Sequence, residues 1–245
     1  MKQKLSWGLT ALLAIAVIVS ACGRQVTPNP PGLGAGGAPP GYLAIFFTVQ
    51  GLLNFSNYQY MVVFNTSGTG VTPSTDTSQT NWAGYKDALI ALGSGNVSAA
   101  EYVQFIPSID GKGPPGWFNP HTTPQQLSYN ANANGSGTEF SMLVQKSILK
   151  PYVSPSPSPS PSATPSNLWT FNAFTTAPGG SRGNWYFEDS LGTGGRTDPQ
   201  FVSPTLCMTE PFDNTYTAYA MTSDPSDQIA TLEIANNPVS PTACP

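Results

Sequence analysis

The chain has 245 residues, of which only 9% are Asp, Glu, Lys or Arg, and its formal net charge is −4. An average globular protein has about 25% charged residues, so Ser, Thr, Asn, Gly and Pro supply much of the polar surface here. The shortage of Lys and Arg argues against a nucleic-acid-binding protein, which needs clustered basic residues. Such a composition is common in exported β-proteins.

The N-terminal segment, residues 1–21, has the order of a secretory signal peptide. Lys2 and Lys4 precede an uncharged apolar run from Leu5 to Val19, which is followed by small residues. The apolar run is shorter than the ~20 residues that a membrane-spanning helix needs. The sequence therefore predicts that residues 1–21 direct export and are removed.

The residues Val19-Ser20-Ala21-Cys22 resemble the lipobox of bacterial lipoproteins. In that family the signal is cut before the cysteine, whose sulfur receives the lipid, with palmitate among the acyl chains. The resemblance implies that Cys22 anchors the mature chain to a bacterial membrane. Gly23 is similar to the pattern that is sorted to the outer membrane or cell surface. The alternatives are an ordinary signal peptide followed by a chance cysteine, and an N-terminal anchor helix.

Residues 22–41 are rich in Gly and Pro and have no apolar periodicity. Such a segment cannot bury enough surface to offset the entropy of ordering it. We expect a flexible tether that holds the folded part on the order of 25 Å from the membrane.

Residues 42–245 are dominated by short apolar runs that end at clusters of Gly, Asn, Ser and Pro, which is the pattern of β-strands. The segment 82–92 fits either a short helix or a strand. About nine strands without a convincing helix predict an all-β protein, an antiparallel β-sandwich. The expected strands are 42–49, 58–65, 101–106, 127–132, 138–148, 168–175, 184–188, 215–221 and 229–234.

A Ser-Pro repeat at residues 154–166 interrupts this pattern. Proline at alternate positions removes amide donors and keeps the backbone extended and solvated. The repeat is either a linker between two domains or an insertion in a loop of one. The residues that follow it offer a thin core for an independent domain, which favours one sandwich over 42–245 with the repeat looped out.

The chain has three cysteines. With Cys22 assigned to lipid, Cys207 and Cys244 remain, and outside the cytoplasm the simplest account is a disulfide between them. A metal site or a reactive thiol is the alternative, but neither cysteine has a neighbouring His or Cys.

The order of the strand-like segments resembles the DOMON-type sandwiches and the related family 9 carbohydrate-binding modules. The similarity rests on YMVVFNTSGTG at 60–70, the aromatic segment at 82–85, the strand at 138–149 and LWTFNAFT at 168–175. It implies a β-sandwich that binds sugar or haem. Haem-binding members use Met and His as axial ligands, and His121 is the chain's one histidine, so no cofactor is expected.

Aromatic residues in loops are the candidates for ligand binding, because an aromatic ring offers a large contact area at low entropy cost. Trp117 and Trp185 lie where Gly- and Pro-rich loops could present them. Trp82 and Tyr85 are further candidates, although each such ring can equally pack in the core.

No catalytic motif is evident. His121 lies in a polar loop without an obvious partner, and Glu188-Asp189 and Glu210 are the least implausible carboxylates for a glycosidase pair. Calcium prefers clustered oxygen ligands, and the loop residues Asp189, Asp198 and Asp213 are candidates for it.

These observations predict a non-catalytic envelope or cell-surface module, held by lipid on Cys22, that binds carbohydrate or another envelope ligand. The alternatives are a structural or assembly subunit of a surface protein complex and a carbohydrate-active hydrolase. The expected partners are the membrane and a glycan or an envelope protein, with no nucleic acid.

Overall fold

The structure is a computed structural model that describes residues 37–66, 87–94, 97–106, 116–131, 137–149, 167–177, 186–191, 205–218 and 224–244. All of them lie in the compact unit formed by residues 34–245. They contain β-strands and one short 3-10 helix, Lys146–Ile148, and no α-helix. No helix within these ranges is long and apolar enough to cross a membrane. Several residues of interest lie outside the ranges, namely Cys22, Trp82, Tyr85, Trp185, Asp198 and the Ser-Pro repeat at 154–166.

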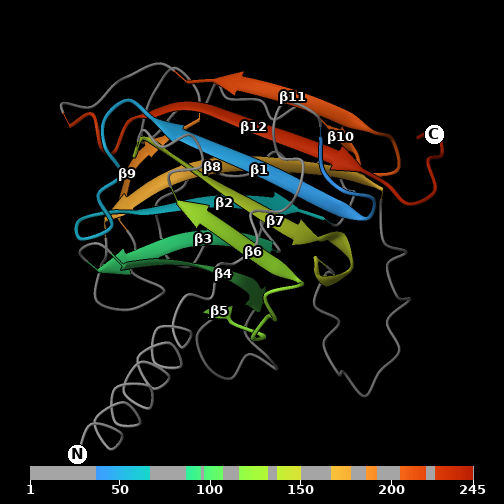
Figure 1. Ribbon diagram of the computed structural model, residues 1–245, viewed down its shortest axis with the longest axis horizontal. Helices are drawn as coiled ribbons and strands as arrows, with labels where there is room; N and C mark the ends of the chain where they lie inside the picture. Colours follow the sequence, from blue (N-terminus) through green and yellow to red (C-terminus); the bar gives the residue numbers. More distant parts are fainter. Residues whose placement is uncertain are drawn as a thin grey trace, which may run out of the picture. The chain divides into compact units, whose positions relative to one another are not determined.

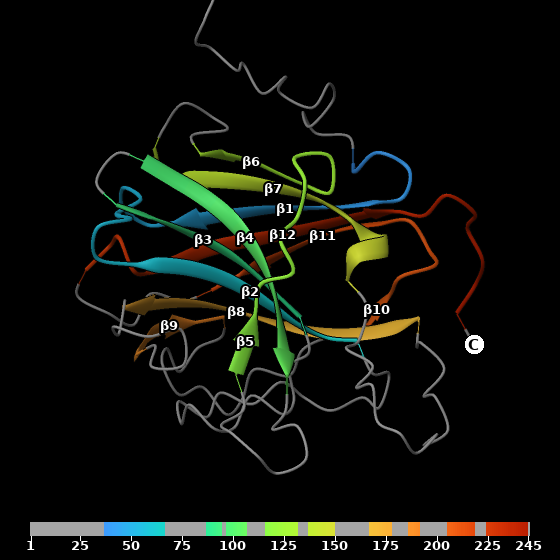
Figure 2. The same ribbon diagram turned by 90° about the horizontal axis from the view of Figure 1, so that it is seen from below.

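The strands form two antiparallel sheets that pack against each other (Figure 1, Figure 2), so the predicted β-sandwich is confirmed. The five-stranded sheet has the order β11 (Phe212–Thr217), β12 (Ile229–Asn237), β1 (Tyr42–Val49), β7 (Glu139–Gln145) and β6 (Leu127–Ala131). The seven-stranded sheet has the order β10 (Leu206–Cys207), β8 (Leu168–Ala177), β2 (Gln59–Asn65), β3 (Asp87–Ser94), β4 (Val97–Ile106) and β5 (Gly116–Phe118), with β9 (Tyr186–Ser190) paired to β8.

The main core lies between the two sheets. Alternate residues of β1, from Leu43 to Val49, point into it, as expected for the period of two along a strand. Phe47 stacks on Phe140 of β7, with ring centroids 5.1 Å apart, and meets the edge of Tyr60 of β2 at 5.7 Å. Rings from both sheets therefore interlock at the centre of the sandwich.

The seven-stranded sheet is buried on its other face as well. A second cluster there contains Met61 and Val63 of β2 together with Ala88 and Ile90 of β3. Because β3 is apolar on both faces, its sequence lacks the polar–apolar alternation of a half-buried strand. That is why 82–92 was ambiguous between helix and strand, and the structure resolves it as a strand at Asp87–Ser94.

Strands from both sides of the Ser-Pro repeat occur in each sheet. In the five-stranded sheet β1 pairs with β12, and in the seven-stranded sheet β2 pairs with β8. The chain before the repeat and the chain after it thus complete the same two sheets.

The observed strands differ from the expected ones at the C-terminal side and in two short additions. The strand expected at 215–221 is found at Phe212–Thr217, because its pairing with β12 begins directly after Pro211. The short strands β5 and β10 were not predicted. Two- and three-residue strands have no periodicity to detect, and β5 lies within a Pro- and Gly-rich stretch.

Contacts with the sandwich begin before Tyr42, within the segment expected to be the tether. The amide of Asn237 donates a hydrogen bond to the carbonyl of Ala38 (2.8 Å), and the N–H of Gly41 donates to the carbonyl of Asn237 (2.6 Å). Gly41 has a positive φ of 84°, a backbone conformation that glycine adopts readily.

Candidate functional site

The surface of the five-stranded sheet that faces away from the core is the candidate site, and we call it the outer face. Its residues alternate with the core residues of the same strands. The centre of the outer face is formed by Phe46 and Thr48 of β1, Glu139 and Ser141 of β7, and Thr231 and Glu233 of β12.

Phe46 is the aromatic ring at the centre of the outer face. It lies on the middle strand of the sheet, in register with Glu233 on one side and Ser141 on the other. Its side chain is only half-buried, and it belongs to neither of the two core clusters. Phe46 therefore lies between a buried apolar part of the outer face, formed by Ala44, Leu143 and Ala235, and a polar part towards Thr48, and neither core cluster accounts for its ring.

Hydrogen-bonding groups surround this ring. The hydroxyl of Thr48 donates to Oε2 of Glu139 (3.2 Å) on the neighbouring strand. On the other side, Glu233 and Asp213 of the edge strand β11 share a hydrogen bond. Desolvation raises the pKa of Glu233, and the negative charge of Asp213, this hydrogen bond and the charge of Glu139 raise it further.

The outer face carries groups of the kinds that can contact a sugar. An aromatic ring can cover the apolar C–H face of a pyranose, and hydroxyls and carboxylates can bond its hydroxyl groups. The Glu233–Asp213 pair does not have the geometry of a glycosidase, since carboxyls that share a hydrogen bond are closer than the ~5–5.5 Å needed for retaining hydrolysis.

The structure places only some of the predicted binding residues. The backbone of Trp117 lies in β5, where it pairs with Phe105 of β4, but its side chain is not among those described. Trp82, Tyr85 and Trp185 lie outside the described residues, so their predicted role as ligand contacts stays a prediction.

Two of the calcium candidates are described, and they are far apart. Asp189 is buried between the sheets, where its Oδ2 accepts the N–H of Ile229 (2.8 Å) at the start of β12. Asp213 is exposed on β11, in register with Ala235. Along β12, the distance from Ile229, which Asp189 contacts, to Ala235, which faces Asp213, is about 20 Å. Within the described ranges no group of three or more His, Cys, Asp or Glu could hold a metal ion.

The proposed glycosidase residues are likewise separated. Glu188 on β9 is next to Asp189, at the Ile229 end of β12, whereas the carbonyl of Glu210 accepts a hydrogen bond from Asn236 at the other end. Seven residues of strand span about 23 Å, more than twice the largest separation of a glycosidase pair. Glu188 and Glu210 therefore do not form such a pair.

His121 is exposed in a loop, with a positive φ of 54°.

The Ile229 end of the sandwich, which we call the acidic end, brings together Tyr58, Asp189, Asp224 and Asp227. The hydroxyl of Tyr58 donates to Oδ2 of Asp224 (2.7 Å). Burial raises the pKa of Asp189 to about 6; the N–H bonds from Ile229 and Ser190 lower it, and the charge of Asp227 raises it. Oδ1 of Asp189 is buried without a hydrogen-bond partner.

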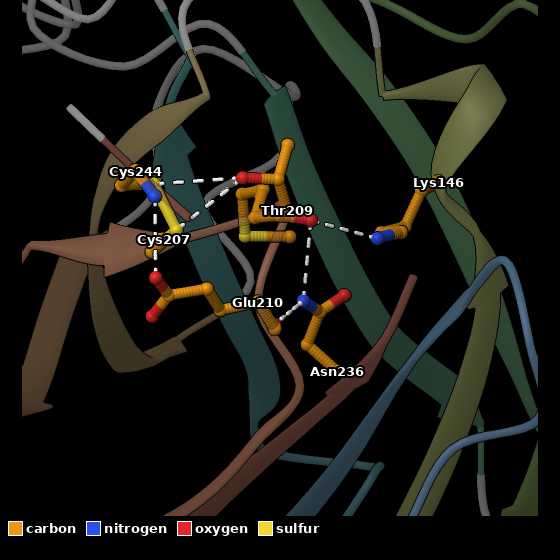
Figure 3. The surroundings of a disulfide bond; sticks show 7 residues. Lys146, Cys207, Thr209, Glu210, Asn236 and Cys244 are labelled. Carbon is orange, nitrogen blue, oxygen red and sulfur yellow. Dashed lines mark hydrogen bonds between the residues drawn. A yellow bond between two sulfur atoms is a disulfide. The ribbon is translucent and has the colours of Figure 1, made fainter. Parts of the chain in front are cut away.

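The opposite end contains the disulfide between Cys207 and Cys244, with a Cα–Cα distance of 6.0 Å, as predicted. Figure 3 shows Lys146 and Asn236 pointing at the loop that follows Cys207. Both donate to the carbonyl of Met208, at 2.9 and 3.2 Å, and Asn236 also donates to that of Glu210. Oε1 of Glu210 accepts the N–H of Cys244 (3.2 Å).

Phe46 was missed by the sequence reasoning. The run YLAIFFTV is apolar at nearly every position, so it does not reveal which of its two adjacent phenylalanines faces the core. The signal that could have identified Phe46 is its two partners, Ser141 and Glu233, which are known only once the strand register is known.

The comparisons with known proteins add no relative. No family model matches the chain, and no curated protein or solved structure matches it.

Proposed function

We propose that the chain is an exported, lipid-anchored bacterial envelope protein that binds carbohydrate on the outer face of its five-stranded sheet. The observation that supports this most is Phe46, a partly exposed aromatic ring on the outer face, with the hydroxyl of Thr48 and the carboxyl of Glu233 beside it. Neither the main core nor the second cluster uses this ring.

The anchor and the export are supported by independent features. The lipobox-like residues ending at Cys22 favour lipid attachment, and the Cys207–Cys244 disulfide is typical of proteins outside the reducing cytoplasm. Polysaccharides and glycolipids of the envelope are within reach of a domain held there.

The outer face favours binding over catalysis. Its carboxyl pair, Glu233 and Asp213, is joined by a hydrogen bond, which suits a fixed set of acceptors for sugar hydroxyls. Uncharged or cationic glycans fit this face better than acidic ones, because Glu139 adds a third carboxylate to it.

A glycan array tests the proposal with the chain from residue 22 onward, carrying Cys22→Ser so that no lipid is attached. We expect binding to a neutral or cationic glycan that Phe46→Ala weakens about fivefold or more, since one aromatic contact is worth about 1 kcal/mol or more. Phe46→Tyr keeps the ring and is the matched control.

A Trp117→Ala variant tests the rival surface. If it abolishes glycan binding while Phe46→Ala leaves it intact, the ligand binds at the β5 side and the outer face is not the site. If the chain binds no glycan, the carbohydrate proposal is overturned, and a role as an assembly subunit of a surface complex takes its place.

A further inference from the structure

The edge strand β11 has a free side. β11 is the last strand of the five-stranded sheet, and β12 is its one partner among the described strands (Figure 1). The N–H of Ala218, just beyond the strand, donates to the carbonyl of Ala230 (3.0 Å). This bond shows which residues of β11 turn their backbone groups towards β12, namely every second residue counted back from Ala218. Because antiparallel residues alternate in the direction of their backbone groups, those of Asp213, Thr215 and Thr217 point away from β12. Among the residues that the structure describes, these outward groups have no hydrogen-bond partner.

Asp213 is the one side chain of β11 of a kind that protects an edge strand. Asp213, Thr215 and Thr217 are all exposed, and the pairing of β11 with β12 is regular throughout. Natural proteins usually guard such an edge with proline, lysine, a bulge or a covering segment, and Phe212–Thr217 contains neither proline nor lysine.

The other edge of the same sheet is different. β6 is half-buried, and Tyr129 from this strand donates a hydrogen bond to Ser98 Oγ (3.0 Å) of β4 in the facing sheet. β6 contacts β4, so this edge of the five-stranded sheet lies against the seven-stranded sheet. The contrast identifies β11 as the edge of this sheet that is available for pairing.

We propose that β11 pairs with β11 of a second copy of the chain, antiparallel and centred on Thr215, to join two five-stranded sheets into one. In this register Thr215 faces Thr215 of the second copy, and Asp213 faces Thr217 of the second copy. All three outward-pointing residues then fall on hydrogen-bonded positions, which gives about six backbone hydrogen bonds.

The charge of Asp213 determines which register of the β11–β11 pair is favourable. Asp213 is the one charged residue of β11, and the Thr215-centred register sets it against a threonine. A register centred on Asp213 would place two carboxylates directly opposite each other, which is unfavourable. The strand is therefore complementary to itself in the one register that uses all three free residues. This inference does not depend on the proposed carbohydrate binding.

Sedimentation velocity of the chain from residue 22 onward, with Cys22→Ser, tests the proposal over concentrations from micromolar to about 1 mM. We expect a concentration-dependent shift from monomer to dimer. Thr217→Asp places a carboxylate opposite Asp213 twice in each dimer and should weaken association about three- to tenfold. Thr217→Asn, similar in shape but uncharged, should leave it within about twofold.

Two further variants determine the register. Thr217→Lys should tighten the dimer, because the lysine then faces Asp213 of the second copy, and added salt should remove this gain. Asp213→Asn in the Thr217→Asp background should restore wild-type association. A chain that stays monomeric up to 1 mM overturns the proposal, as does a dimer whose affinity is the same for Thr217→Asp and Thr217→Lys.

Discussion

The two ends of β12 are fixed to the rest of the sandwich by opposite kinds of chemistry. At the disulfide end, a covalent bond holds the C-terminal segment, and the side chains of Lys146 and Asn236 donate to carbonyls of the loop after Cys207. At the acidic end, the carboxylate of Asp189 accepts the N–H of Ile229 from inside the sandwich. The main constraint at one end is a covalent bond that does not titrate, whereas the other end depends on a buried carboxyl that does.

The disulfide end restricts the unfolded chain as well as the folded one. The bridge closes a loop with a sequence separation of 37 residues. The donors around it satisfy carbonyls that would otherwise be left without partners, and burial lowers the pKa of the Lys146 ammonium. The acidic end has no such covalent link, and its buried carboxyl has one oxygen without a partner. We therefore expect the acidic end to be the less stable of the two.

Removal of the disulfide should have the largest effect. Cys207→Ala with Cys244→Ala should lower the free energy of unfolding by about 4 kcal/mol, because the unfolded chain regains the entropy of the closed loop. Guanidinium unfolding of the oxidised chain and of the double variant measures the difference. Cys22→Ser is the control and should leave the unfolding midpoint unchanged. Equal midpoints for the double variant and the oxidised chain would contradict the assignment of the disulfide as the main constraint at this end.

Asp189→Asn should remove a pH dependence from the acidic end. The folded chain holds the Asp189 proton more tightly than the unfolded chain, since its pKa is raised from 3.8 to about 6. The contribution of this group to stability is therefore largest below about pH 4 and falls as the pH rises to about 6. For a group that is fully buried, this shift corresponds to a change of about 3 kcal/mol.

The measurement for Asp189 is the difference in unfolding free energy between wild type and Asp189→Asn, from pH 4 to pH 7. This difference should shift in favour of the variant as the pH rises to 6, and then level off. A difference that is constant across this range would show that the carboxyl of Asp189 is not shifted by burial.

Tyr58→Phe should have the smallest effect of the three. It removes the hydrogen bond to Asp224, which lies near the surface, so the expected loss is about 0.5–1.5 kcal/mol. The N–H of Ser226 contributes most to lowering the pKa of Asp224, and the Tyr58 hydroxyl contributes second. NMR titration of the Asp224 carboxyl should therefore give a higher pKa in the variant than in the wild type, and an unchanged pKa would exclude this contact.

Most of the fold could be predicted from the sequence, because strands bounded by turn residues leave a clear local signal. The disulfide could also be predicted, by assigning Cys22 to lipid and pairing the remaining two cysteines. The orientation of individual side chains could not. In β1 both Phe46 and Phe47 are apolar, yet Phe47 lies in the main core and Phe46 on the outer face. That distinction depends on partners distant in the sequence, such as Glu233 and Ser141.

The role of Asp189 was also beyond the sequence. Its loop-like surroundings suggested a calcium ligand, whereas its carboxylate bonds a backbone amide of the facing sheet. The pairing that aligns it with Thr175 of β8 and turns it inward is set by a strand register that no local pattern encodes. For the same reason the sequence could not show which residues of β11 point their backbone groups away from β12, because this depends on how the two strands pair.

Chemical-shift mapping with the bound glycan tests the central claim most directly. In two-dimensional 1H–15N spectra of the chain, we predict that the largest shifts occur at the amides of Phe46, Ser141 and Glu233, with smaller shifts on β11. Shifts confined to β4 and β5, around Trp117, would contradict the account and move the binding surface to the other sheet.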